Sequence, residues 1–193
     1  MLKELLYPLV DRISFFNIFQ YITFRAAYAA ITALCISFIF GPRLILVLKR
    51  LKAKQQVRED GPQSHLSKSG TPVMGGLLII LSVVISVILW QDFQSGYTWI
   101  VLLALVAFGL IGFLDDFIKI SKKNSDGMRA GVKFGGQIII SLCLVLYLYY
   151  ARRADTTFLY LPFFKNPVIN MEAVYIPFAV ILLVGTSNAV NLT

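Results

Sequence analysis

The sequence predicts an all-α membrane protein with about five transmembrane helices. Hydrophobic residues make up 58% of its 193 residues, against roughly 45–50% in soluble domains. They gather in runs that are nearly free of charge, and a membrane-spanning helix needs about 20 mainly apolar residues. Five runs approach that length, at residues 21–40, 72–90, 97–114, 134–150 and 174–192. We therefore expect residues 1–193 to form a single transmembrane domain.

The basic residues are unevenly divided between the segments that connect these runs. Residues 41–71 contain seven Lys and Arg and residues 115–133 contain five, whereas residues 91–96 contain none and residues 151–173 contain three. Cytoplasmic loops are enriched in Lys and Arg, which predicts that 41–71 and 115–133 are cytoplasmic, 91–96 and 151–173 extracytoplasmic, and the N-terminus outside. The net charge of +8 is thereby explained without a nucleic-acid partner.

The N-terminal segment, residues 1–20, is predicted to lie along the membrane interface. Its apolar residues recur at helical spacing, as in an interfacial helix, at Leu5, Leu6, Leu9 and Ile13. Arg25 follows near the outer end of the first apolar run, where a long side chain can extend to water. Neither feature predicts a function.

Two adjacent carboxylates, Asp115 and Asp116, follow the third apolar run. Adjacent carboxylates at a bilayer boundary repel each other unless a cation offsets them. If the helix continues, Lys119 and Lys123 lie on the same face. Such a face suits a metal-bound diphosphate, because carboxylates can hold a metal or accept a proton while ammonium groups offset phosphate charge. An ordinary helix end with an acid–lysine pair is the alternative.

A second polar stretch leads into the second apolar run. It contains Lys68 and Thr71 and continues through Pro72 to Gly75 and Gly76. Thr71 can cap a helix and Pro72 suits its first turn. A helix N-terminus at the cytoplasmic surface, with Lys68 beside it, could bind a phosphate. Alternatively, Thr71 is a plain cap and the glycines allow a close helix crossing.

The end of the fifth run is polar as well. Ser187, Asn188 and Asn191 are spaced so that they share one side of a helix. Their groups could bind a nucleobase, a ribose or a carboxylate that ligates a metal, or they could hold helices together. Lys133 opens the fourth run and could be a phosphate ligand or a membrane-surface anchor. His65, the only histidine, lies in a polar loop and is typical of a solvated side chain.

Taken together, these strings resemble the phospho-N-acetylmuramoyl-pentapeptide transferase family, or translocase I, of bacterial cell-wall synthesis. The resemblance covers the whole chain and is carried by the strings at residues 19–26, 60–76, 112–116 and 188–193. The second of these contains Gly-Pro-Gln-Ser-His followed by Lys-Ser-Gly-Thr-Pro. Related transferases that move other hexosamine phosphates lack that combination.

The resemblance implies a Mg²⁺-dependent enzyme of the bacterial inner membrane, with about ten spans in the complete family architecture. It would transfer phospho-N-acetylmuramoyl-pentapeptide from UDP to undecaprenyl phosphate, giving lipid I and UMP at the inner leaflet. Asp115 and Asp116 match the family's catalytic pair. The basic substrate-contacting positions and the nucleoside-side asparagines match Lys68, Lys119, Lys123, Lys133, Asn188 and Asn191, and the metal ligands stay unassigned. Besides both substrates and the bilayer, a homodimer is a further partner to consider.

Two departures from the family pattern stand out. Val73 replaces a threonine, which removes one hydroxyl as a ligand. The chain also ends at Thr193, where the family continues, so we expect these 193 residues alone to be inactive. An inactive membrane fragment and a transferase for another UDP-hexosamine are therefore alternative functions. A transporter would instead require ionisable residues at mid-membrane.

Overall fold

A computed structural model describes residues 1–50, 74–122, 127–151 and 156–192, with side chains as far as Ala189. The chain divides into two compact units, Met1–Met128 and Arg129–Thr193. Each unit is mainly helical, which confirms the predicted all-α class.

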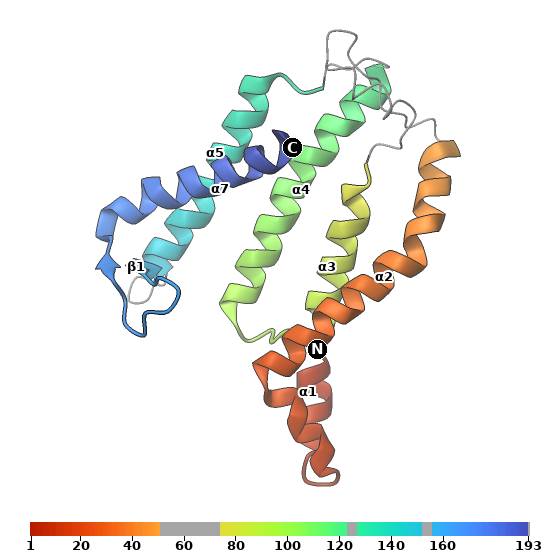
Figure 1. Ribbon diagram of the computed structural model, residues 1–193, viewed down its shortest axis with the longest axis vertical. Coiled ribbons are helices and arrows are strands. Elements are labelled where there is room, and N and C mark those ends of the chain that lie inside the picture. Colours follow the sequence, from red (N-terminus) through yellow and green to blue (C-terminus); the bar gives the residue numbers. More distant parts are fainter. Residues whose placement is uncertain (51–73, 123–126, 152–155, 193) are drawn as a thin grey trace. The chain divides into compact units, whose positions relative to one another are not determined.

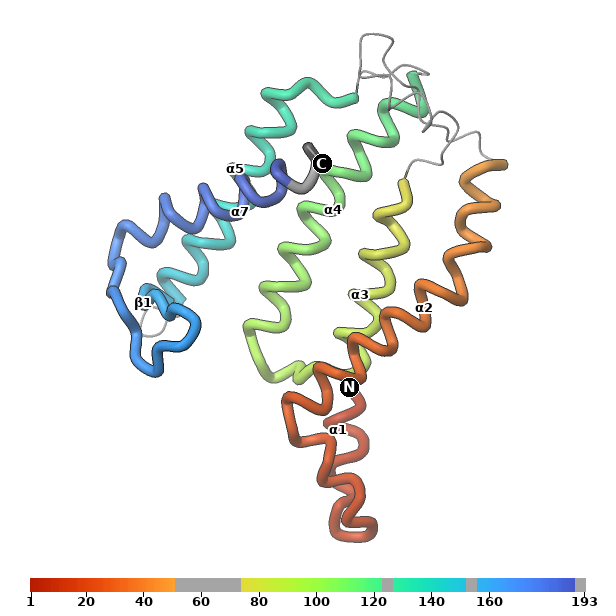
Figure 2. Tube along the Cα trace, in the orientation of Figure 1, coloured from red at the N-terminus to blue at the C-terminus, as the bar shows by residue number. Residues whose placement is uncertain are grey.

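Three long helices form most of the first unit. Its elements, in order, are α1 (Leu2–Leu6), η1 (Tyr7–Leu9), η2 (Ser14–Gln20), α2 (Ile22–Arg50), α3 (Gly76–Trp90) and α4 (Gly96–Lys122). Helix α3 lies between α2 and α4, and neighbouring helices run in opposite directions (Figure 1). The end of α2, the start of α3 and the end of α4 therefore lie at one end of this unit (Figure 2).

The second unit is a pair of helices joined by a short hairpin. Its elements are α5 (Ala130–Ala151), β1 (Phe158–Leu159), β2 (Ile169–Asn170), η4 (Glu172–Val174) and α7 (Tyr175–Leu192). The two strands pair antiparallel, with Phe158 opposite Asn170. Helices α5 and α7 pack against each other.

Each of the five predicted runs coincides with a helix, although the lengths differ. Within the described residues, four helices are long and apolar enough to cross a membrane: Ile22–Arg50, Gly96–Lys122, Ala130–Ala151 and Glu172–Ala189. Helix α3 is also strongly apolar but has only 15 residues. Few residues of the four long helices are buried inside the structure, as expected for helices that face lipid. The chain is a multi-pass membrane protein.

Side-chain hydrogen bonds join α2 to α3. Ser82 and Ser86 are buried, and the Ser37 hydroxyl donates to Ser82 Oγ at 3.1 Å. Near the other end of α3, Trp90 Nε1 donates to Thr32 Oγ1 at 2.9 Å. Apolar side chains gain little by leaving lipid for another helix, so small residues and interhelical hydrogen bonds contribute to packing here. This contact fixes α3 beside α2.

The N-terminal segment differs from the predicted interfacial helix. It is broken into α1 and two 3₁₀ helices, and Pro8, which lacks an amide N–H, lies in the first of these. It also covers Arg25, which is only 5% exposed and donates from Nη1 to the Phe19 carbonyl oxygen at 3.2 Å. The prediction that Arg25 extends to water is therefore wrong, because the preceding residues fold back over the start of α2.

Candidate active site

Asp115 is a buried carboxylate near the last turns of α4. Only 8% of the residue is exposed. Helix α4 continues past the predicted end at residue 114 to Lys122, which places Lys119 one turn beyond Asp115. Lys119 Nζ lies 2.7 Å from Asp115 Oδ2 and 3.8 Å from Asp116 Oδ1. The predicted shared face is confirmed for Asp115, Asp116 and Lys119, whereas Lys123, its fourth predicted member, lies outside the described residues.

The second oxygen of Asp115 is held from outside the helix. The backbone N–H of Met128 donates to Asp115 Oδ1 at 2.8 Å. A lysine ammonium and a main-chain amide thus bind the two oxygens separately, and hydrogen bonds to a carboxylate are stronger than those between neutral groups. This carboxylate is fixed in orientation before any substrate arrives.

The two aspartates have different surroundings. The side chain of Asp116 is 30% exposed, against 11% for that of Asp115. Asp116 is therefore the carboxylate more accessible to a ligand approaching from solvent, whereas Asp115 is buried and accepts a hydrogen bond from the Met128 N–H. Together with Lys119 they form a mixed-charge group suited to a phosphate or to a metal-bound phosphate.

The depth of this group along α4 can be compared with the thickness of a bilayer. Asp115 is nineteen residues after Gly96, the first residue of the helix. At 1.5 Å per residue that distance is roughly 28 Å, close to the roughly 30 Å of a hydrocarbon core. If α4 spans the membrane from Gly96, Asp115 and Lys119 lie at the opposite boundary.

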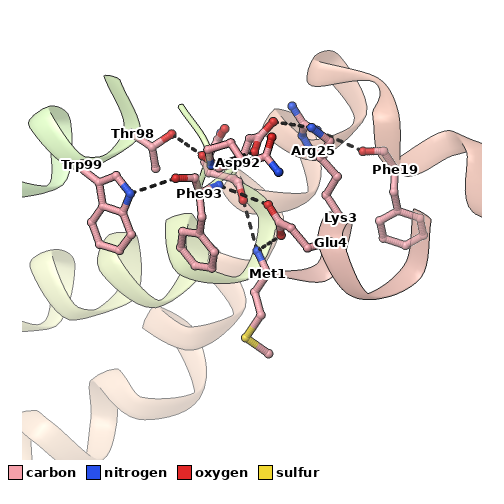
Figure 3. Close-up of polar contacts among 11 residues, drawn as sticks. Met1, Lys3, Glu4, Phe19, Arg25, Asp92, Phe93, Thr98 and Trp99 are labelled. Carbon is pink, nitrogen blue, oxygen red and sulfur yellow. Dashed lines mark hydrogen bonds and ion pairs between the residues drawn. The ribbon is translucent and has the colours of Figure 1, made fainter. Parts of the chain in front are cut away.

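A second cluster of polar contacts lies next to the N-terminal end of α4. We call it the N-terminal clasp, and it is formed by Lys3, Glu4, Asp92 and Phe93. Lys3 pairs with Asp92, and the Phe93 N–H donates to Glu4 Oε1 at 3.2 Å (Figure 3). The hydrogen bond from Lys3 lowers the pKa of Asp92 and outweighs burial, which raises it. Asp92 is therefore ionised at neutral pH, and the clasp ties α1 to the turn before α4.

The second unit contains a polar group built around Asn188. Its Nδ2 donates to Gln137 Oε1 at 2.7 Å and to the Val184 carbonyl oxygen at 2.8 Å, and Gln137 Nε2 donates to Ser187 Oγ at 3.2 Å. Gln137 is 3% exposed. These bonds join α5 to α7. Of the two roles predicted for Asn188, ligand binding or holding helices together, its side chain performs the second in this structure.

Gln137 was missed by the sequence reasoning. Its signal is a lone amide inside the apolar run 134–150, where polar groups are generally bonded across helices. Lys133 lies one turn earlier on α5 and is half-buried, so it shares a face with Gln137. Lys133 and the Gln137 amide therefore lie on one side of α5, whether Lys133 is a phosphate ligand or a membrane-surface anchor.

The remaining predicted site residues have side chains outside the described part of the chain. Asn191 belongs to α7, but its side chain lies outside the described part of the chain. The others outside the described residues are Lys68, Thr71 and Lys123, together with His65 and Val73. The structure thus brings together Asp115, Asp116 and Lys119 in the first unit, and Asn188 with Gln137 in the second.

The helices define a multi-pass membrane protein with a group of charged side chains near the end of α4, and sequence comparison gives its family. Residues 98–193 match the family described as Glycosyl transferase family 4. Among the curated relatives that match the whole chain are three named phospho-N-acetylmuramoyl-pentapeptide-transferase. Those of Thermodesulfovibrio yellowstonii, Desulfosudis oleivorans and Syntrophus aciditrophicus are 44%, 48% and 47% identical to it.

The chain therefore belongs to glycosyl transferase family 4, and within it to the phospho-N-acetylmuramoyl-pentapeptide transferases. The resemblance inferred from its sequence strings is confirmed. All of this chain is matched in each comparison, whereas it covers 54% of each of these three relatives. The chain thus spans about half the length of the curated relatives it matches.

Proposed function

We propose that this chain contributes to the transfer of phospho-N-acetylmuramoyl-pentapeptide from its UDP carrier to undecaprenyl phosphate, which yields lipid I and UMP. The observation that carries the proposal is the match of its whole length to transferases of that name. The site supports it, because two carboxylates and an ammonium group meet at one end of a helix of membrane-spanning length.

The reaction requires charge stabilisation more than proton removal. The second pKa of a phosphate monoester is about 6, so undecaprenyl phosphate is mostly dianionic at pH 7. One of its oxygens can attack the sugar-bearing phosphorus directly, while the bond from that phosphorus to the oxygen of the leaving UMP breaks. The Lys119 ammonium offsets charge on the transferring group. Asp115 or Asp116 positions the reactants or briefly accepts a proton, and a covalent aspartyl intermediate is the alternative route.

The donor set is compatible with Mg²⁺, which proteins commonly hold through one or two carboxylates together with substrate phosphates. Asp116 offers the more exposed carboxylate. Within the described residues, no three His, Cys, Asp or Glu side chains form a group that could hold a metal ion. We propose that Asp116, with Asp115 beside it, supplies this chain's share of the ligands. Bound Mg²⁺ would neutralise charge on the diphosphate.

We further propose that the Asp115 end of α4 faces the cytoplasm and that the N-terminal clasp lies outside, as the Lys and Arg distribution predicts. Single cysteines at Arg50 and Lys122 should then react with a membrane-impermeant maleimide only from the cytoplasmic side, and those at Ser95 and Asn166 only from outside. The background should have Cys35 and Cys143 replaced by alanine, because both native thiols are exposed in the structure. Labelling of position 122 from outside would contradict the orientation.

The substrate is tested in the completed protein, in which residues 1–193 are continued by the remaining length of the Desulfosudis oleivorans relative. With undecaprenyl phosphate and Mg²⁺, UDP-N-acetylmuramoyl-pentapeptide should release UMP at least ~100-fold faster than UDP-N-acetylglucosamine does. A site that hydrogen-bonds a substrate's polar groups rejects analogues lacking them by large factors. Equal rates, or a preference for the smaller sugar, would favour the related transferase that uses another UDP-hexosamine.

A further inference from the structure

We propose that Gly127 is a positioning residue for the reaction: its missing side chain leaves the space in which the Asp115 carboxylate is held against the Met128 amide. This inference rests on the proposed function, because it gives Asp115 a role in the transfer. It concerns a residue that has no chemical group of its own and that no sequence motif discussed above includes.

The side chains of Asp115 and Lys119 occupy the space beside Gly127. A Cβ atom added to Gly127 would lie 2.2 Å from Asp115 Oδ1 and 2.7 Å from Lys119 Cε. Real Cβ atoms essentially never approach other atoms so closely, and ordinary contact begins at 3.4 Å. Any side chain at this position must therefore displace the carboxylate, the lysine or both by roughly 1 Å.

The glycine is required for its lack of bulk and not for an unusual backbone. The positive φ angles among described non-glycine residues occur at Met74, Phe163 and Glu172, and Gly127 has no φ in the left-handed range. Alanine can therefore adopt its backbone conformation. The atoms in the way are the ends of flexible side chains, so we expect Gly127→Ala to fold with Asp115 moved.

Moving the Asp115 carboxylate disturbs one of its two hydrogen bonds more than the other. Oδ1 accepts from the Met128 N–H and Oδ2 from Lys119 Nζ, at 2.8 and 2.7 Å. Since Gly127 precedes Met128 directly, a methyl group there pushes on the same oxygen that the Met128 amide binds. We expect a carboxylate that retreats from the methyl group to lengthen or bend its hydrogen bond with the Met128 N–H.

The test is the kinetics of Gly127→Ala in the completed protein. We expect kcat for lipid I formation to fall about 100-fold, a loss that a 1 Å misplacement of a positioned group can cause, with the KM for the UDP substrate changed less than about threefold. The matched control is Gly131→Ala, four residues on, where an added Cβ meets nothing within 4 Å; its kcat should stay near that of the unmodified protein.

Two further measurements separate positioning from a general loss of stability. In an Asp115→Asn background, Gly127→Ala should lower kcat by no more than about threefold, because both changes act through one carboxylate and are not additive. The amide resonance of Met128, assigned in ¹⁵N-methionine-labelled protein by its loss in Met128→Leu, reports the hydrogen bond directly. Its exchange with water should accelerate about tenfold or more in Gly127→Ala and in Asp115→Ala, and stay unchanged in Gly131→Ala.

The outcomes distinguish this inference from the proposed function. Full activity of Gly127→Ala beside an inactive Asp115→Asn would overturn the positioning role and leave the function intact. Absence of lipid I formation by the unsubstituted protein would instead contradict the function, and the Met128 amide would still show whether Gly127 holds Asp115. If Gly127→Ala fails to accumulate, an unchanged Met128 amide in Asp115→Ala would overturn the inference by itself.

Discussion

Asp115→Asn and Asp116→Asn should each lower lipid I formation by the completed protein at least ~100-fold, with the protein still present in the membrane at near-normal levels. Removing one preorganised charged or polar group from such a site typically costs about 10²–10³ in kcat. Asparagine keeps the shape of the side chain, and its oxygen can still accept from the Met128 N–H that Asp115 binds. We therefore expect a loss of chemistry with little loss of folding.

The matched control is Asp92→Asn. Asp92 is also a carboxylate paired with a lysine, but it belongs to the N-terminal clasp at the opposite end of α4. An ion pair of this partly exposed kind contributes on the order of 0–1 kcal/mol to stability. Transfer by Asp92→Asn should therefore be close to that of the unsubstituted protein. Near-normal transfer by Asp116→Asn would reduce that residue to an ordinary helix-end carboxylate.

Much of this architecture could be predicted from local sequence pattern. The apolar runs give the helices, because length and charge-free composition are what the bilayer selects. The spacing of Asp115 and Lys119 gives their shared face once the helix is assumed to continue. Both predictions depend on residues close together in the chain, where the geometry of a helix fixes the outcome.

The contacts that complete the site could not be predicted in this way. The hydrogen bond from Met128 to Asp115 joins residues thirteen apart across the end of a helix, and no periodicity gives the path of the chain between them. Gln137 and Asn188 meet across two helices. Arg25 is covered by the segment that precedes α2, and its Nη1 donates to the Phe19 carbonyl oxygen. Each of these is a tertiary contact, which local pattern does not specify.

The second large effect concerns the chain by itself. We expect residues 1–193 alone to form no lipid I from both substrates and Mg²⁺ in detergent or vesicles. The chain spans 54% of the length of its relatives, and phosphoryl transfer depends on a full set of positioned charges. The visible site supplies two carboxylates and one lysine from α4. Adding the rest of a relative's length as a separate polypeptide should supply what is missing.

UMP release by the chain with and without that second polypeptide tests the account most directly. We predict no release by residues 1–193 alone, release when the two polypeptides are combined with UDP-N-acetylmuramoyl-pentapeptide and undecaprenyl phosphate, and its loss on Asp116→Asn in the first. Release by residues 1–193 alone that Asp116→Asn abolishes would contradict the claim that this chain holds only part of the site. Release by the combined polypeptides that survives Asp116→Asn would contradict the site itself.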